Sequence, residues 1–251
     1  MSDDSFDKVL SNTAQFLRLL REAGLTDQAR QRVIDDPTFR AELVHFWNGN
    51  HAYNDTVTPE QAATIMGNNF HGIDALEHHL GVKLSAKSKR LFGSVPFSAE
   101  IMQACAQTHV LVACGQLSLM DVWLVQTDLF YDIDPWFKAM RFANAKERAG
   151  WQLVRKQPVS NSTCKSFNEQ KALLGANEMI PSLSVLSQAI ILTYLETKEC
   201  LFPGIFVRAS SGDRAILGQF NGRSFHIDYF AWVSDEPNGG IGLASSIKPS
   251  S

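Results

Sequence analysis

The chain has 251 residues, of which 45% are hydrophobic and 20% charged, and its formal net charge is -3. This length suits one large domain or two small ones, and the composition excludes a chain that is disordered or of low complexity throughout. No run approaches the ~18 uncharged apolar residues of a membrane-spanning helix, and the acidic start lacks the apolar segment of a secretory signal. The 4 cysteines are too few for a disulfide framework. We therefore expect a soluble cytoplasmic protein with no membrane partner.

The first part of the chain, residues 1–92, is predicted to be helical. Over residues 6–20, apolar side chains recur at steps of three and four, which is the pattern of one apolar helix face. The segment TPEQ at 58–61 has the spacing of a capping box and predicts a helix start. A further helix is predicted at 73–80, ended by Gly81.

The character of the chain changes after residues 82–93, which are basic and contain few bulky side chains. We therefore expect a domain boundary here, between a helical subdomain at 1–92 and a mixed α/β domain at 93–251. In the second domain, Ser98 predicts the N-cap of a helix. The short β-branched run VLVAC at 110–114 predicts a buried strand.

The second domain is predicted to end in an antiparallel sheet. The expected elements are a strand at 151–155, a helix at 181–196 and strands at 205–209, 215–220 and 224–233. Asn221-Gly222 is the dipeptide of a two-residue type I′ hairpin, which would place Phe220 opposite Arg223. We predict an α+β fold, with a helical N-terminal part followed by a mixed α/β part that ends in an antiparallel β-meander. A doubly wound α/β sheet is the alternative.

Charge is unevenly distributed, because residues 81–171 hold 12 basic and 7 acidic side chains whereas residues 1–80 hold 6 and 12. A basic middle region favours an anionic partner such as nucleic acid. Within it, a predicted strand leads into a loop of short polar side chains, and a helix follows, so cations, hydroxyls and free backbone amides would meet. The candidate anion-binding residues are Arg155, Lys156, Asn161, Ser162 and Lys165. The alternative is an ordinary helix cap with cations in solvent.

A second candidate site pairs Cys105 with His109, four residues apart at the end of a predicted helix. A thiol and an imidazole at this spacing have the residue types of a nucleophile and its base, and Asp121 would orient the imidazole if the chain folds back. The alternative is an inert core cysteine, because the sequence around it is apolar.

Two further groups of polar residues are more typical of structure than of function. His71, Asp74 and His78 recur at steps of three and four, but the spacing lacks the pattern of a zinc motif, and we expect a solvated helix face. His226 and Asp228 would share one face of the last hairpin, where a hydrogen-bonded pair is the expected reading. No metal site and no cofactor are predicted.

Several separated segments, in the same order, resemble an uncharacterised family of bacterial hypothetical proteins. They are the segments at 95–122, 150–174, 201–210 and 240–249, among them LFPGIFVRAS and GIGLASSIKP. The resemblance covers about residues 90–250 and implies that this part is one evolutionary unit. It implies no activity.

Three functions follow from these patterns. The first is a non-enzymatic intracellular binding protein that engages an anionic partner, nucleic acid being one class, through its basic central region. The second is a hydrolase-type enzyme that uses Cys105 and His109. The third is a homo-oligomeric assembly or protein-interaction protein.

Overall fold

The computed structural model describes residues 57–130, 138–210, 215–220, 224–228 and 237–249, with residues 215–220 and 227–228 described by their backbone. Residues 55–251 form one compact unit. The helix expected at 6–20 and the turn Asn221-Gly222 lie outside the described residues.

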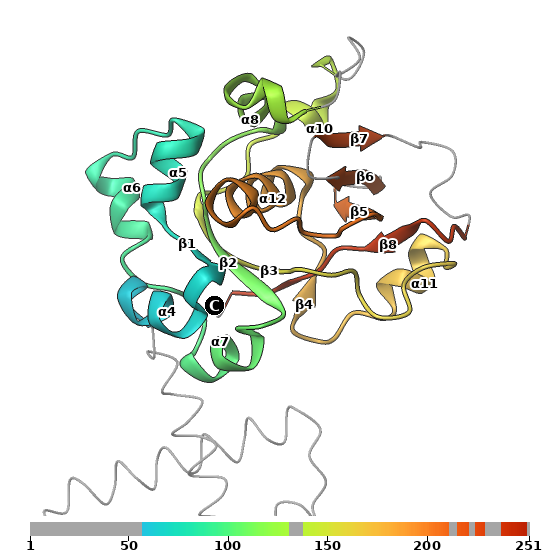
Figure 1. Ribbon diagram of the computed structural model, residues 1–251, viewed down its shortest axis with the longest axis horizontal. Helices are drawn as coiled ribbons and strands as arrows, with labels where there is room; N and C mark the ends of the chain where they lie inside the picture. The colour runs from blue at the N-terminus through green and yellow to red at the C-terminus, as the bar shows by residue number, and fades with distance from the viewer. Residues whose placement is uncertain (1–56, 131–137, 211–214, 221–223, 229–236, 250–251) are drawn as a thin grey trace, which may run out of the picture. The chain divides into compact units, whose positions relative to one another are not determined.

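The first sheet in the described residues is five-stranded, in the order β1-β2-β3-β9-β4 (Figure 1). Its strands are β1 (Phe70–His71), β2 (His109–Cys114), β3 (Gly150–Arg155), β4 (Glu178–Met179) and β9 (Ser246–Ile247). β1 is parallel to β2, and the other pairs are antiparallel. β2 forms the middle of the fold because every one of its side chains is buried. The strands predicted at 110–114 and 151–155 are therefore confirmed.

The second sheet is four-stranded, in the order β7-β6-β5-β8. Its strands are β5 (Phe206–Ser210), β6 (Ala215–Phe220), β7 (Phe225–Asp228) and β8 (Ile241–Leu243). β5, β6 and β7 are successive antiparallel strands, so the predicted meander is present. The α+β class is confirmed. The doubly wound alternative is not formed, because β2 and β3 run antiparallel, whereas that fold needs parallel strands joined by crossover helices.

The predicted register of the last hairpin is wrong by two residues. Phe220 pairs with Phe225 and not with Arg223, and Gly218 pairs with Ile227. The connection therefore spans four residues and not two. Because side chains alternate with a period of two, this shift leaves the same residues on the same face of the sheet.

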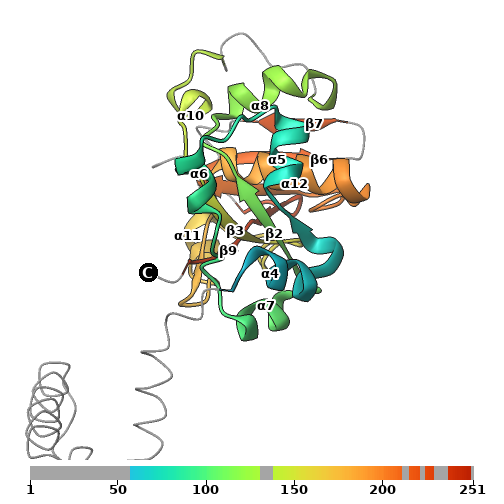
Figure 2. The same cartoon turned by 90° about the vertical axis from the view of Figure 1, so that its left-hand side faces the viewer.

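The helices surround the two sheets (Figure 2). They are α4 (Pro59–Met66), α5 (Ile73–Leu80), α6 (Ala86–Leu91), α7 (Ala99–Cys105), α8 (Leu119–Val125), α10 (Arg141–Asn144), α11 (Phe167–Lys171) and α12 (Leu183–Thr197), with 3-10 turns η1 (Gly67–Asn69) and η2 (Thr127–Leu129). The predicted capping box of Thr58 and Gln61 is present, and Ser98 caps α7. Gly81 ends α5 in the left-handed conformation at φ 63°.

α12 is the central helix of the fold, because it packs against strands of both sheets (Figure 1). Every residue from Leu183 to Thr193 is buried, as expected for a helix that has neighbours on all sides. Its buried amide, Gln188, accepts a hydrogen bond of 2.8 Å from the backbone N–H of Gly115, the residue after β2. The exposed end of α12 beyond these residues carries Glu196.

The expected domain boundary after residue 92 falls inside the compact unit. β1, from the predicted helical part, hydrogen-bonds to β2, and α4 packs against α7. Buried side chains from both sides of residue 92, such as Leu76 and Leu111, belong to one core. Residues 57–92 therefore share their core with the rest of the unit.

Within the described ranges, no helix has the length and apolar character needed to cross a membrane.

Candidate functional site

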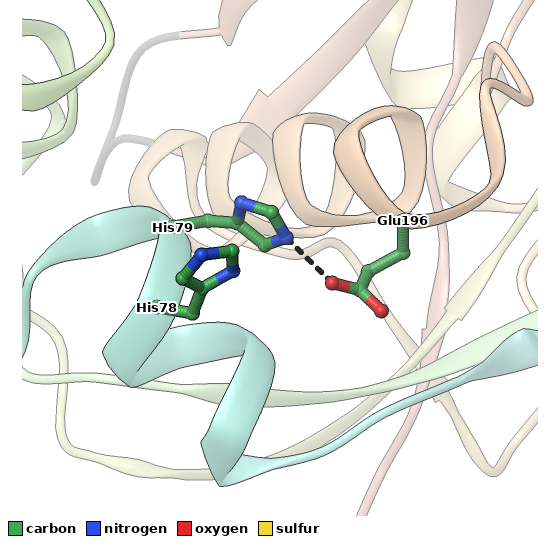
Figure 3. Close-up of side chains that lie close together, drawn as sticks. All are labelled: His78, His79 and Glu196. Carbon is green, nitrogen blue, oxygen red and sulfur yellow. Dashed lines mark hydrogen bonds and ion pairs between the residues drawn. The ribbon is translucent and has the colours of Figure 1, made fainter.

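Two histidines and a glutamate converge where the last turn of α5 meets the last turn of α12 (Figure 3). His78 and His79 are neighbours in α5, and Glu196 comes from α12. The Nε2 atom of His79 lies 2.5 Å from Oε1 of Glu196, and the two imidazole rings have centroids 4.4 Å apart. One ligand atom of each of the three side chains lies within 4.8 Å of the others. We call this group the His-His-Glu cluster.

The position of the cluster is fixed by the ends of the two helices. Gly81 terminates α5 directly after the histidines, and the carbonyl of His79 accepts a 2.5 Å hydrogen bond from the side chain of Gln126. This bond satisfies one of the carbonyls that a helix end leaves without a partner. α12 ends at Thr197, the residue after Glu196, and Lys198 follows in the left-handed conformation. His78 and Glu196 are exposed, so solvent reaches the cluster.

A second polar group lies near the same end of α12. Nζ of Lys156 donates to Oδ1 of Asn69 at 2.9 Å and forms an ion pair of 2.7 Å with Glu199. The lysine side chain is 15% exposed, so these bonds compensate its partial removal from water. The group joins residues from η1, the end of β3 and the chain after α12.

His71, in β1, is the most buried titratable group near the cluster. It is 1% exposed, and within the described part of the chain neither ring nitrogen has a hydrogen-bond partner. Burial lowers the pKa of His71 to about 4, against the opposing charges of Glu196 and Glu199. The imidazole is therefore neutral near pH 7.

The structure does not assemble the predicted anion site from Arg155 and Lys156. Arg155 forms an ion pair of 3.5 Å with Glu178, and Lys156 pairs with Glu199. Consecutive residues of an extended chain point to opposite sides, so the two cations do not converge. Both charges are already matched by carboxylates of the same chain.

The loop residues of the predicted anion site also have other contacts. The hydroxyl of buried Ser162 accepts a 3.0 Å hydrogen bond from the backbone N–H of Leu243. Asn161 is exposed, with φ of 60°. The carbonyl of Lys165 accepts a 3.4 Å hydrogen bond from buried Arg208. Ser162 thus has a structural contact, because it joins the loop to β8.

Cys105 and His109 are not hydrogen-bonded to each other. Nδ1 of His109 pairs with the hydroxyl of Thr108 at 2.8 Å, and its buried Nε2 has no partner among the described residues. Burial raises the pKa of the Cys105 thiol and lowers the pKa of His109 to about 4. In a nucleophile–base pair the pKa of the thiol is lowered, whereas that of Cys105 is raised. Asp121 caps its own helix at Ser118 and pairs with Lys146.

Of the two remaining polar groups, the first differs in part from its expected arrangement. His71 is buried in β1, outside the helix, whereas Asp74 and His78 are exposed one turn apart in α5, so only these two share a helix face. His226 lies in β7, where its Nε2 is 3.0 Å from the hydroxyl of Ser224. Asp228 is described by its backbone alone, so its expected pairing with His226 stays a prediction.

Three exposed cations of the basic middle region lie in or beside α6. Lys83, Lys87 and Arg90 are exposed and form no ion pair with a described residue, whereas Lys89 pairs with Glu77 at 3.1 Å. No residue of α6 is buried. We call Lys83, Lys87 and Arg90 the α6 surface.

The sequence analysis missed the His-His-Glu cluster because Glu196 lies 117 residues from His79. A partner at that separation has no local signature. The one sequence signal was the adjacent pair of histidines in the last turn of a predicted helix.

Searches against protein-family models, characterised proteins and solved structures found no match to this chain. The resemblance of residues 90–250 to a family of bacterial proteins stays a prediction.

Proposed function

We propose that this protein binds an anionic partner, with nucleic acid as the class to test, through the α6 surface. The observation that carries the proposal is that Lys83, Lys87 and Arg90 are exposed and have no carboxylate partner among the described residues. Their charges are free to act on an external anion.

The local structure of α6 suits contact with phosphates. Ser85 caps the helix by accepting a 3.1 Å hydrogen bond from the backbone N–H of Ser88, which fixes the start of α6. Lys87 and Arg90 are three residues apart and therefore share a helix face. Lysine and arginine that neutralise phosphates release condensed counterions, and this release drives binding without base recognition.

The proposal keeps the partner class predicted from the basic middle region but relies on different residues. Arg155 and Lys156 form ion pairs with Glu178 and Glu199, so an external phosphate would have to displace these carboxylates. The α6 surface needs no such displacement.

The test is a titration of labelled single- and double-stranded oligonucleotides between about 50 mM and about 200 mM salt, a range over which phosphate contacts weaken steeply. We expect salt-sensitive binding by the native chain. In the triple variant Lys83→Glu/Lys87→Glu/Arg90→Glu, the slope of log K against log salt should fall by about 2 to 3, because each phosphate contact contributes about 0.7 to 0.9.

The matched control is Arg141→Glu/Lys165→Glu/Lys171→Glu, which changes the net charge equally away from α6. These cations lie in or beside α10 and α11. We expect the control to keep most of the salt slope. Loss of slope in the control but not in the α6 variant would transfer the site to the cations in or beside α10 and α11 and overturn the proposal. The absence of binding at low salt would also overturn it.

A further inference from the structure

We propose that His78, His79 and Glu196 bind a divalent transition-metal ion of the zinc type. The proposal is independent of the α6 surface, since it rests on different residues. It is based on three ligand atoms that lie within 4.8 Å of one another (Figure 3). These atoms belong to two helices that are far apart in the sequence.

The spacing of the three side chains is close to what an ion requires. Zinc is bound at about 2.0 to 2.2 Å by imidazole nitrogen and carboxylate oxygen, so two tetrahedral ligands lie about 3.4 Å apart. The widest separation in the cluster therefore has to shrink by about 1.4 Å or less. Exposed His78 and Glu196 can make this adjustment by side-chain rotation.

The contact between His79 and Glu196 marks where the ion would enter. Their Nε2 and Oε1 atoms are 2.5 Å apart, which is the distance of a hydrogen bond between the ring and the carboxylate. A metal ion would replace this hydrogen bond, because a neutral imidazole can keep its one hydrogen on Nδ1 and offer Nε2 as a ligand. The two atoms then separate by about 0.9 Å to reach ligand spacing.

The donor set selects the class of ion. Two imidazoles and one carboxylate suit zinc and other first-row transition ions, whereas calcium and magnesium favour oxygen ligands. Three protein ligands leave a coordination position open to water or to another ligand, which is the arrangement of catalytic and not of structural zinc sites. The bond from Gln126 to the carbonyl of His79 holds the backbone that carries both imidazoles.

The surroundings of the cluster also favour a cation. Glu196 and Glu199 are near His71, and Lys156 is paired with Glu199, so the local carboxylates are not outnumbered by cations. His71 interacts electrostatically with Glu196 and His79 and is itself buried and uncharged near pH 7. It therefore adds no positive charge that would repel the ion.

The experiment is equilibrium binding of Co²⁺, followed by its visible absorption and by displacement with Zn²⁺. It uses the full chain without a histidine tag and with Cys164→Ser, because Cys164 is an exposed thiol that could capture these ions itself. We expect one equivalent of Co²⁺ per chain, with displacement by Zn²⁺. Absence of binding would overturn the proposal.

The residues are tested by His78→Ala, His79→Ala and Glu196→Gln. Each should weaken binding by about tenfold or more, since even the loss of a group that only orients a metal ligand costs about 10- to 100-fold. The control is Asp74→Ala, an exposed carboxylate one turn before His78 in the same helix. It should bind as the native chain does. If Asp74→Ala costs as much as Glu196→Gln, or if Glu196→Gln costs nothing, the assignment is wrong. Circular dichroism of each variant shows that it is folded.

Discussion

At the scale of single residues, burial decides the chemistry of the histidines. His71 and His109 are both buried, and burial lowers the pKa of each to about 4. A side chain that acts as a general base near neutral pH needs a pKa close to neutral pH. His109 is thus a neutral core imidazole held by Thr108, whereas His79, at the surface, pairs with Glu196. Residue type alone did not distinguish a buried histidine from one that pairs with a carboxylate.

This burial makes stability depend on pH at His109. An unfolded imidazole has a pKa of about 6.5 and binds a proton between about pH 6.5 and about pH 4, where the folded one does not. The contribution of His109 to the free energy of unfolding is therefore fully present above about pH 6.5 and is lost as the pH falls toward 4. Between about pH 7 and about pH 5 the loss reaches up to about 2 kcal/mol.

Urea unfolding of the native chain and of His109→Gln at these two pH values, with a chelator present, measures this loss. The variant should lose up to about 2 kcal/mol less than the native chain on acidification. His71 is present in both proteins, so its own titration cancels in the comparison. An equal loss in both proteins would show that His109 does not carry the dependence.

At the scale of elements, helix starts follow from local sequence because caps are local. Thr58 and Ser98 each accept a hydrogen bond from a backbone N–H three residues later, as their spacing predicted. The hairpin register did not follow, because Phe220 pairs with Phe225, so four residues and not two separate the paired positions. Strand register depends on contacts along both strands, which one dipeptide does not determine.

The caps of α12 and α6 should differ in their effect on stability. Ser182 accepts a hydrogen bond from the backbone N–H of Val185 at the start of a buried helix, and Ser85 does the same for an exposed one. We expect Ser182→Ala to lower the free energy of unfolding by about 1 kcal/mol. Ser85→Ala should change it by less than about 0.5 kcal/mol, because α6 buries no residue and can fray alone.

Chemical denaturation of the two variants makes the comparison. The midpoint should shift clearly for Ser182→Ala and hardly for Ser85→Ala. Equal shifts would mean that α6 is as firmly bound to the core as α12, and that its cations are less accessible than their exposure suggests.

At the scale of the whole molecule, the candidate site depends on contacts between distant parts of the chain. Glu178, Glu196 and Glu199 are the carboxylate partners of Arg155, His79 and Lys156. Glu196 and Glu199 lie at the end of α12 and just after it, so the burial of α12 between the sheets brings them to their partners. Glu178 lies in β4 and is placed by the pairing of β4 with β9. The sequence predicted the helix and the basic residues separately, but the charge pairing appears only when the helix is placed. That is why the predicted anion site is internally neutralised.

The same long-range packing determines which fragments of the chain can fold on their own. β1 is hydrogen-bonded to β2, and Leu76, Leu80 and Phe92 are buried in the core shared with the later strands. A fragment of residues 93–251 would leave one edge of β2 without its partner and expose apolar surface that these side chains cover. Deleting one large core side chain costs about 2 to 5 kcal/mol, and the net stability of a domain is about 5 to 15 kcal/mol.

We therefore expect the fragment 93–251 to lack a cooperative unfolding transition and to aggregate, and the fragment 55–251 to unfold cooperatively. Thermal denaturation followed by circular dichroism, with light scattering of both fragments, distinguishes them. A cooperative transition in 93–251 would restore the boundary predicted after residue 92 and would mean that β1, α4 and α5 form a separable layer. In either case the fragment 93–251 cannot form the His-His-Glu cluster, because two of its residues precede that boundary and one follows it.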